Sequence, residues 1–160
     1  MGLTRTQGWE QRLVAYLEAA RRKPYVLGEH DCLRVALGSV EALTGKDLWP
    51  LFAGKYATRL QSLRLLADRS RWAEFSGQPL SVEAAEAAVA QAGSPFDAAF
   101  NLLFGTELTG IKRASRGDVC KYSDGEEHLG VCTGSFVAVL TSKRMAFVPL
   151  LSCRACWRIG

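Results

Sequence analysis

The sequence predicts an α+β fold in which N-terminal helices pack on a C-terminal antiparallel sheet. Apolar residues recur at helical spacing up to about residue 112, whereas after Gly117 short apolar runs alternate with turn residues. Helices first and strands afterwards are typical of the α+β class. With 160 residues, 48% of them hydrophobic and 22% charged, the chain is long enough to bury one core, and we expect residues 1–160 to form a single domain.

The first predicted helix begins near Trp9 and ends before Pro24, which cannot continue it. Its apolar face recurs at helical spacing and consists of Trp9, Leu13, Tyr16, Leu17 and Ala20. The basic residues 21–23 are expected in its last turn, where they complement the helix dipole.

The second predicted helix begins directly after Asp31, which is a natural N-cap, and ends at Gly45. Its buried face comprises Leu33, Ala36, Leu37, Val40 and Leu43. Cys32 is therefore expected in the first turn, at the positive end of the helix dipole.

The middle of the chain is mostly helical in pattern, though less regular. Residues 56–72 carry an apolar stripe of Leu60, Leu63 and Leu66, and residues 81–92 are rich in alanine. The Gly-Ser-Pro run at 93–95 interrupts these helices. The stripe favours a buried face with a solvated opposite face over a nucleic-acid surface.

Five strands are predicted in the last third of the chain, at residues 118–122, 128–132, 136–141, 145–150 and 157–159. Turns are expected at 123–125 and 133–134, which contain glycine beside small polar residues.

Charge and hydropathy narrow the classes of partner. Lysine and arginine number 20 against 16 acidic residues, a net charge of +4 that is scattered along the chain, so we expect no nucleic-acid partner. No apolar run approaches the roughly 20 residues of a membrane span, and no signal-peptide pattern opens the sequence.

The cysteines are expected to be reduced, because no secretory signal is evident. Cys120, Cys132, Cys153 and Cys156 are four thiols in the sheet region, and four thiolates can hold zinc or an iron–sulfur cluster. A single CxxC pair is a weak signal for such a site, so buried free thiols are preferred and no metal or cofactor is expected. A metal-binding adaptor is kept as an alternative.

Cys32 and His128 are the candidate catalytic residues. A cysteine nucleophile acts as a thiolate, and both a helix N-terminus and a neighbouring histidine lower a thiol pKa. The chain has only two histidines, and His128 begins a strand that can lie against the start of the second helix. His30 is adjacent to Asp31 and too near Cys32 in sequence for a direct bond, so we expect both residues to give positioning or capping support.

Three motifs resemble the NlpC family of papain-like cysteine peptidases. Residues 24–32, which end in Gly-Glu-His-Asp-Cys, resemble the segment that leads to that family's nucleophile. Arg116-Gly-Asp-Val119 resembles its Gly-Asp-Val/Leu strand entry, and His128-Leu-Gly-Val131 resembles the strand that holds its base. The resemblance implies a papain-like NlpC fold, with a helical insertion at about 50–112, and a peptidase or amidase activity.

A narrower resemblance is to short phage and prophage proteins related to NlpC enzymes and encoded among tail genes, which end in a strand like Ala155-Cys156-Trp157-Arg158. This resemblance implies a virion tail protein that is assembled in the host cytoplasm and acts at the host cell wall or periplasm. The implied substrate is a peptidoglycan stem peptide, and the implied partners are other tail proteins.

The sequence departs from the NlpC pattern at the third catalytic position. NlpC enzymes orient the base with a polar residue of the next strand, but the matching positions here are Ala138, Val139 and Leu140, with Thr141 the nearest polar residue. A missing orienting residue leaves the tautomer of His128 unset. It favours the alternative of a structural tail-tip protein, a hub or adaptor that keeps the NlpC fold with reduced or lost catalysis.

Overall fold

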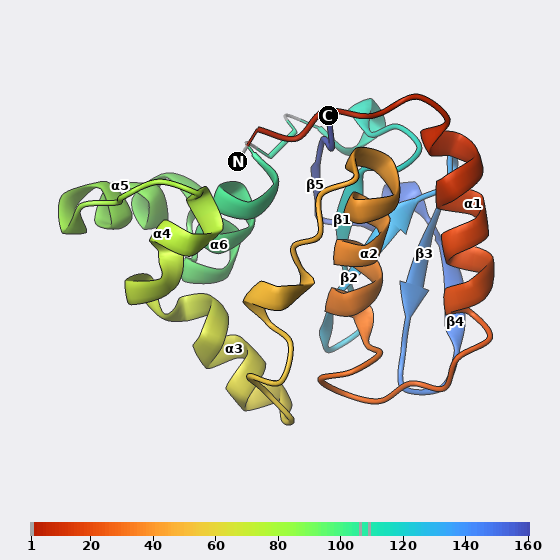
Figure 1. The fold of residues 1–160 in the computed structure, drawn as a ribbon, viewed down its shortest axis with the longest axis horizontal. Helices are drawn as coiled ribbons and strands as arrows, with labels where there is room; N and C mark the ends of the chain where they lie inside the picture. Colours follow the sequence, from red (N-terminus) through yellow and green to blue (C-terminus); the bar gives the residue numbers. More distant parts are fainter. Residues whose placement is uncertain (1, 106, 109) are drawn as a thin grey trace.

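The computed structural model describes residues 2–105, 107–108 and 110–160. Within these ranges six α-helices precede a five-stranded antiparallel sheet (Figure 1), which confirms the α+β class. The helices are α1 (Trp9–Ala20), α2 (Cys32–Thr44), α3 (Arg59–Ala67), α4 (Trp72–Ser76), α5 (Val82–Ala92) and α6 (Pro95–Phe104). The strands are β1 (Val119–Ser123), β2 (Glu127–Cys132), β3 (Phe136–Leu140), β4 (Met145–Pro149) and β5 (Ala155–Trp157).

Helices α1 and α2 form the layer that covers the sheet. Helix α2 contacts β2 and β3, and α1 packs on α2 (Figure 1). The two helices approach closely because the Tyr16 ring lies against Gly38, where a side chain would collide with it, and the Tyr16 hydroxyl donates to the Arg34 carbonyl at 3.2 Å. The periodicity predicted both helices, but the basic residues 21–23 follow the end of α1 instead of lying in its last turn.

The helical segment, residues 49–113, contains α3 to α6 and gathers beside the sheet (Figure 1). The single stripe expected over 56–72 is divided in two. Helix α3 begins after a capping box formed by Thr58 and Gln61, and it ends at Asp68, whose carboxylate accepts hydrogen bonds from Ser70 and so caps the next turn. Helix α5 begins after the serine cap Ser81 and ends before the predicted break at 93–95, and α6 begins within that break, after the serine cap Ser94.

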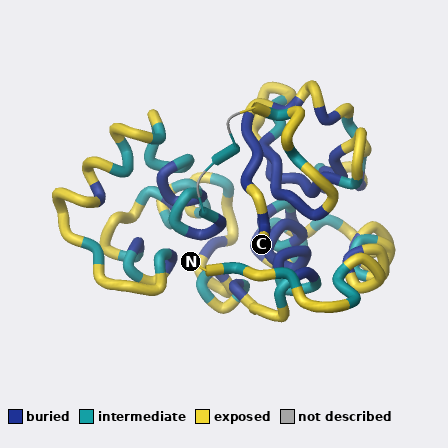
Figure 2. Tube along the Cα trace, turned by 90° about the horizontal axis from the view of Figure 1, so that it is seen from above, coloured by how far each residue is buried: buried dark blue, intermediate teal, exposed yellow. Residues whose placement is uncertain are grey.

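The strands lie in the order β4-β3-β2-β1-β5. In the β1–β2 hairpin Tyr122 pairs with His128, and the hairpin turn, residues 124–126, overlaps the turn predicted at 123–125 but lies one residue later. One hydrophobic cluster joins the helical segment to the sheet; among its largest fully buried side chains are Trp72, Phe75 and Trp157. Figure 2 shows that the buried stretches concentrate in the sheet and the helix against it, whereas much of the outer chain is exposed.

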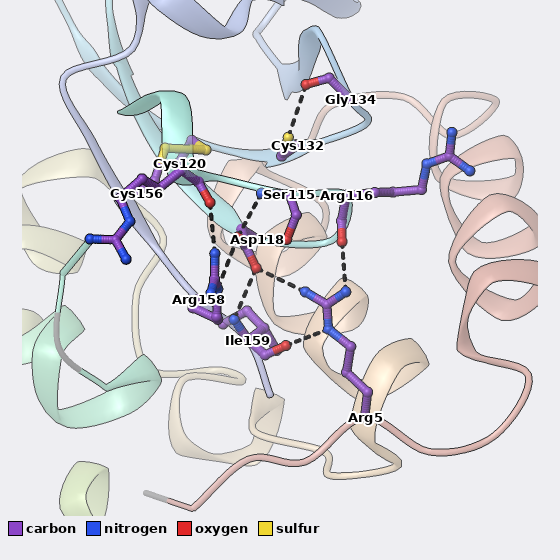
Figure 3. Close-up of polar contacts among 11 residues, drawn as sticks. Arg5, Ser115, Arg116, Asp118, Cys120, Cys132, Gly134, Cys156, Arg158 and Ile159 are labelled. Carbon is purple, nitrogen blue, oxygen red and sulfur yellow. Dashed lines mark hydrogen bonds and ion pairs between the residues drawn. A yellow bond between two sulfur atoms is a disulfide. The ribbon is translucent and has the colours of Figure 1, made fainter. Parts of the chain in front are cut away.

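A buried carboxylate fastens both ends of the chain to the start of β1. Asp118 has no exposed surface and accepts hydrogen bonds from Arg5 Nη2 at 2.9 Å, the Ser115 amide at 2.8 Å and the Ile159 amide at 3.1 Å (Figure 3). Arg5 also donates to the Ile159 carbonyl at 2.6 Å. The Arg-Gly-Asp-Val motif therefore holds the N-terminal segment and the end of the chain together beside the sheet.

The expectation that all the cysteines are free thiols is wrong for two of them. Cys120 and Cys156 occupy directly opposite positions of β1 and β5 and form a disulfide (Figure 3). Cys132 and Cys153 are free and are buried in the same small hydrophobic cluster. Among the described residues no three His, Cys, Asp or Glu side chains are grouped as metal ligands. None of the described helices is long and apolar enough to cross a membrane.

Candidate active site

A cavity lies where the start of α2, strands β1 and β2 and the helical segment meet. The cavity is small, with a volume of about 80 Å³, which is below the usual range of small-molecule sites. Its lining includes Cys32, His128 and Asp31, three of the four site residues predicted from the sequence, but not His30.

Cys32 is the first residue of α2 and is partly exposed. Burial raises the pKa of its thiol to about 11, although backbone hydrogen bonds from Leu129 and Leu33 and the Arg59 charge act in the opposite direction. The lowered thiol pKa expected from the helix start is therefore wrong. Desolvation of the sulfur outweighs the helix N-terminus, so the resting state at neutral pH is the thiol.

His128 lies on β2 and is largely buried. Its Nε2 is 3.0 Å from Asp124 Oδ1, and its ring stacks on Tyr122 with centroids 6.5 Å apart. If Nε2 carries the proton and donates to Asp124, Nδ1 is an acceptor. Among the described residues, none forms a hydrogen bond with this Nδ1. The next residue, Leu129, hydrogen-bonds Cys32 through its backbone, so β2 lies against the start of α2, and the side chains of Cys32 and His128 line the same cavity.

Asp124 is the hydrogen-bond partner of His128 that sequence reasoning missed. It belongs to the β1–β2 turn, and the backbone amide of Glu126 and the side chain of His128 lower the pKa of its carboxyl. The positions that match the NlpC pattern, Ala138, Val139 and Leu140, are buried in the core. The available signal was the turn itself, because an aspartate four residues before His128 in a tight hairpin lies beside the start of the second strand.

Asp31 organises the backbone around the thiol. Its side chain is buried and accepts three hydrogen bonds, from the Gly28 amide at 2.8 Å, the Tyr56 hydroxyl at 2.6 Å and the Arg34 amide at 3.0 Å. Burial and the neighbouring Asp31 carboxylate raise the pKa of Tyr56. Gly28 has a φ of 86°, and a side chain there would collide with the Tyr56 backbone. The Gly-x-x-Asp-Cys spacing thus fixes the helix start, and Asp31 positions Cys32.

His30 has a structural position outside the cavity. Its Nε2 is 2.9 Å from the carbonyl of Ala20, the last residue of α1, and its backbone bridges to Val26. It therefore supports the loop that leads to Cys32 and ties this loop to the end of α1.

Charged residues of the lining, which sequence reasoning also missed, are largely paired with one another. Lys121 on β1 donates to Asp97 of α6 at 2.7 Å and lies 3.8 Å from Glu127. Arg59 at the start of α3 donates to the Glu127 carbonyl at 2.7 Å. These contacts hold the helical segment against the hairpin that carries His128. Tyr25 also lines the cavity, and burial followed by electrostatic interactions with Cys32 and Asp31 raises its pKa.

Comparison with known families gives one match, which covers nearly the whole chain. A family described as a domain of unknown function, DUF6950, matches residues 4–159. The chain belongs to the DUF6950 family. Cys32, Asp124 and His128 all fall inside the matched region. No curated protein and no solved structure matched the DUF6950 chain.

Proposed function

We propose that this DUF6950 protein is a papain-like cysteine hydrolase of the NlpC type, with Cys32 as nucleophile and His128 as general base. The observation that carries the proposal is that Cys32 and His128 line the same cavity. Cys32 begins α2, the residue after His128 hydrogen-bonds its sulfur, and Asp124 occupies Nε2 of the imidazole. A nucleophile, a base and an orienting carboxylate are the three parts that such chemistry requires.

Because the raised pKa of Cys32 keeps its sulfur protonated at rest, the proton is transferred during the attack and not before it. The thiol gives its proton to Nδ1 of His128 as the sulfur attacks the substrate carbonyl, and Asp124 stabilises the imidazolium that forms. The imidazolium then protonates the leaving amine, and a thioester remains on Cys32. Water attacks this thioester with His128 again as the base, which releases the acid and restores the thiol.

Stabilisation of the tetrahedral intermediate is assigned to the start of α2. The backbone N–H of Cys32 lies in the first turn, where amides have no partner within the helix and the helix dipole is positive. Such a donor supports an oxyanion as it develops on the substrate carbonyl.

The proposed substrates are amide bonds of peptidoglycan stem peptides, and the proposed setting is a phage tail that assists cell-wall penetration. Support for the substrate comes from the motif resemblance around Cys32, Asp118 and His128, and support for the setting comes from the narrower resemblance that includes Ala155-Cys156-Trp157-Arg158. The two free thiols in the sheet core lie outside the cavity lining, so they serve as internal controls.

The test is hydrolysis of purified stem peptides, read by mass spectrometry, with the wild type, Cys32→Ala, His128→Ala and Cys153→Ala. Cleavage by the wild type and by Cys153→Ala, but by neither active-site variant, is the expected result, and the product masses identify the bond. Cleavage that persists in folded Cys32→Ala would overturn the proposal.

A structural tail-tip subunit that keeps the NlpC fold with reduced or lost catalysis is the second candidate. The raised pKa of Cys32 favours it, because the sulfur is protonated at neutral pH. This candidate predicts that the folded wild type cleaves no stem peptide but binds other tail proteins, and that Cys32→Ala binds them equally well.

A further inference from the structure

The helical segment gives the cavity an apolar wall. Helices α3 and α6 contribute the side chains of Leu63, Leu66, Phe96 and Phe100, and Leu27 from the loop before Cys32 adds to them. Leu66 and Phe100 are buried, whereas Leu63 and Phe96 are partly exposed to the cavity and solvent. An apolar ligand that covers these surfaces gains the free energy of removing them from water.

Most polar groups of the lining already have partners within the protein. Lys121 is paired with Asp97, and the Tyr56 hydroxyl is held by Asp31. The Ser62 hydroxyl donates to the carbonyl of the residue three positions earlier. A ligand in this cavity therefore meets apolar surface beside Cys32 and His128, with few polar groups that are not already engaged.

We propose that the cavity binds an apolar acyl group and that the site hydrolyses acyl esters as a substrate class additional to stem peptides. The inference rests on the proposed function for its chemistry, because Cys32 and His128 carry out the hydrolysis. The apolar wall supplies the specificity, since each methylene buried against it strengthens binding.

The ester reaction uses water as its co-reactant. Cys32 Sγ forms a bond to the acyl carbon while its proton passes to His128, and the carbon–oxygen bond breaks as the alcohol leaves with that proton. Water then attacks the thioester carbon, its proton passes to His128, and the carbon–sulfur bond breaks. The proton returns to the sulfur, so the net reaction converts ester and water into carboxylic acid and alcohol.

Hydrolysis of p-nitrophenyl acetate, butyrate and hexanoate tests the chain-length dependence, with Cys32→Ala as the background. Full burial of each methylene changes kcat/KM by roughly fourfold. We therefore expect kcat/KM to rise by at least about tenfold from the acetate to the hexanoate ester. Leu63→Gln should reduce this preference by placing an amide in the wall. Leu60→Gln is the matched control, because Leu60 lies on the same helix, is 56% exposed and is outside the cavity lining.

Calorimetric titration of Cys32→Ala with hexanamide reports on the cavity without catalysis. Binding that is weakened by adding Leu63→Gln, together with the chain-length preference in the wild type, supports the inference. Cysteine-dependent cleavage of acetate and stem peptides with no rise toward hexanoate overturns the acyl inference and leaves the proposed function standing. Binding of hexanamide without cleavage of any substrate by the wild type overturns the proposed function and, with it, the ester hydrolysis.

Discussion

The protonation state of Cys32 distinguishes the proposed mechanism from one that starts with a thiolate–imidazolium pair. Burial raises the pKa of the thiol from 9.0 to about 11. At pH 7 this leaves about one molecule in 10⁴ as thiolate, against about one in 10² for a thiol with the ordinary value. Because the thiolate is the reactive form, alkylation of Cys32 at pH 7 should be roughly a hundredfold slower than that of a simple thiol.

The assay is alkylation by iodoacetamide from pH 6 to pH 11, with the modified peptide that contains Cys32 quantified by mass spectrometry. N-acetylcysteine provides the reference rate, and peptide mapping separates Cys32 from the two buried free thiols. The rate should rise about tenfold per pH unit up to about pH 10. A fast rate that is independent of pH between 6 and 8 would refute the reasoning, because only a thiolate stabilised at neutral pH produces such a plateau.

Three further predictions follow from the site and the sheet. Asp124→Asn should lower kcat on any cleaved substrate about ten- to a hundredfold with little change in KM, because it weakens the orientation of His128. The control Glu126→Gln, in the same turn, should leave kcat within about twofold. Equal losses of kcat in both variants would contradict the orienting role of Asp124. Tyr56→Phe should lower the free energy of unfolding by about 1–3 kcal/mol, since Asp31 loses a buried donor; urea denaturation measures this, and an unchanged midpoint would contradict it. Reduction of the β1–β5 disulfide should lower the free energy of unfolding by about 2–4 kcal/mol. Urea denaturation with and without dithiothreitol measures this, and identical curves would contradict it.

Stability at alkaline pH should respond to the thiol of Cys32, whose pKa is raised. The folded pKa of Cys32 is raised, so the folded state holds its proton more tightly than the unfolded chain and stability falls as pH rises from about 9 to 11. We expect Cys32→Ser to reduce this fall by up to about 2 kcal/mol, as measured by urea denaturation at pH 8 and pH 10.5. Parallel losses in the wild type and the variant would show that other groups control the alkaline transition.

Local sequence signals predicted the elements whose ends are marked by a capping residue or by a change in apolar spacing. Asp31 and Gly45 marked the two ends of α2, and the change of period after Gly117 marked the sheet. The division of the 56–72 stripe was not predicted, because it depends on how Asp68 caps a new turn. Apolar spacing alone carries no information about such local competition for backbone amides.

The sequence predicted only part of the candidate site, because some of its features depend on contacts between distant residues. Cys32 and His128 stood out because their motifs have a local pattern, and both line the cavity. Asp124, the Cys120–Cys156 disulfide and the raised thiol pKa depend on which residues the fold brings together. Strand register and burial decide these features, and neither can be read from spacing along one chain.

The most direct test of the central claim is the capture of an acyl-enzyme on Cys32. The wild type is mixed with p-nitrophenyl butyrate or a stem peptide, quenched in acid within the first turnover and analysed by intact mass and peptide mapping. The account predicts an acyl adduct on the peptide that contains Cys32, absent in Cys32→Ala and retained in Cys153→Ala. Product formation without this adduct, or with the same adduct on another residue, would contradict the assignment of Cys32 as the nucleophile.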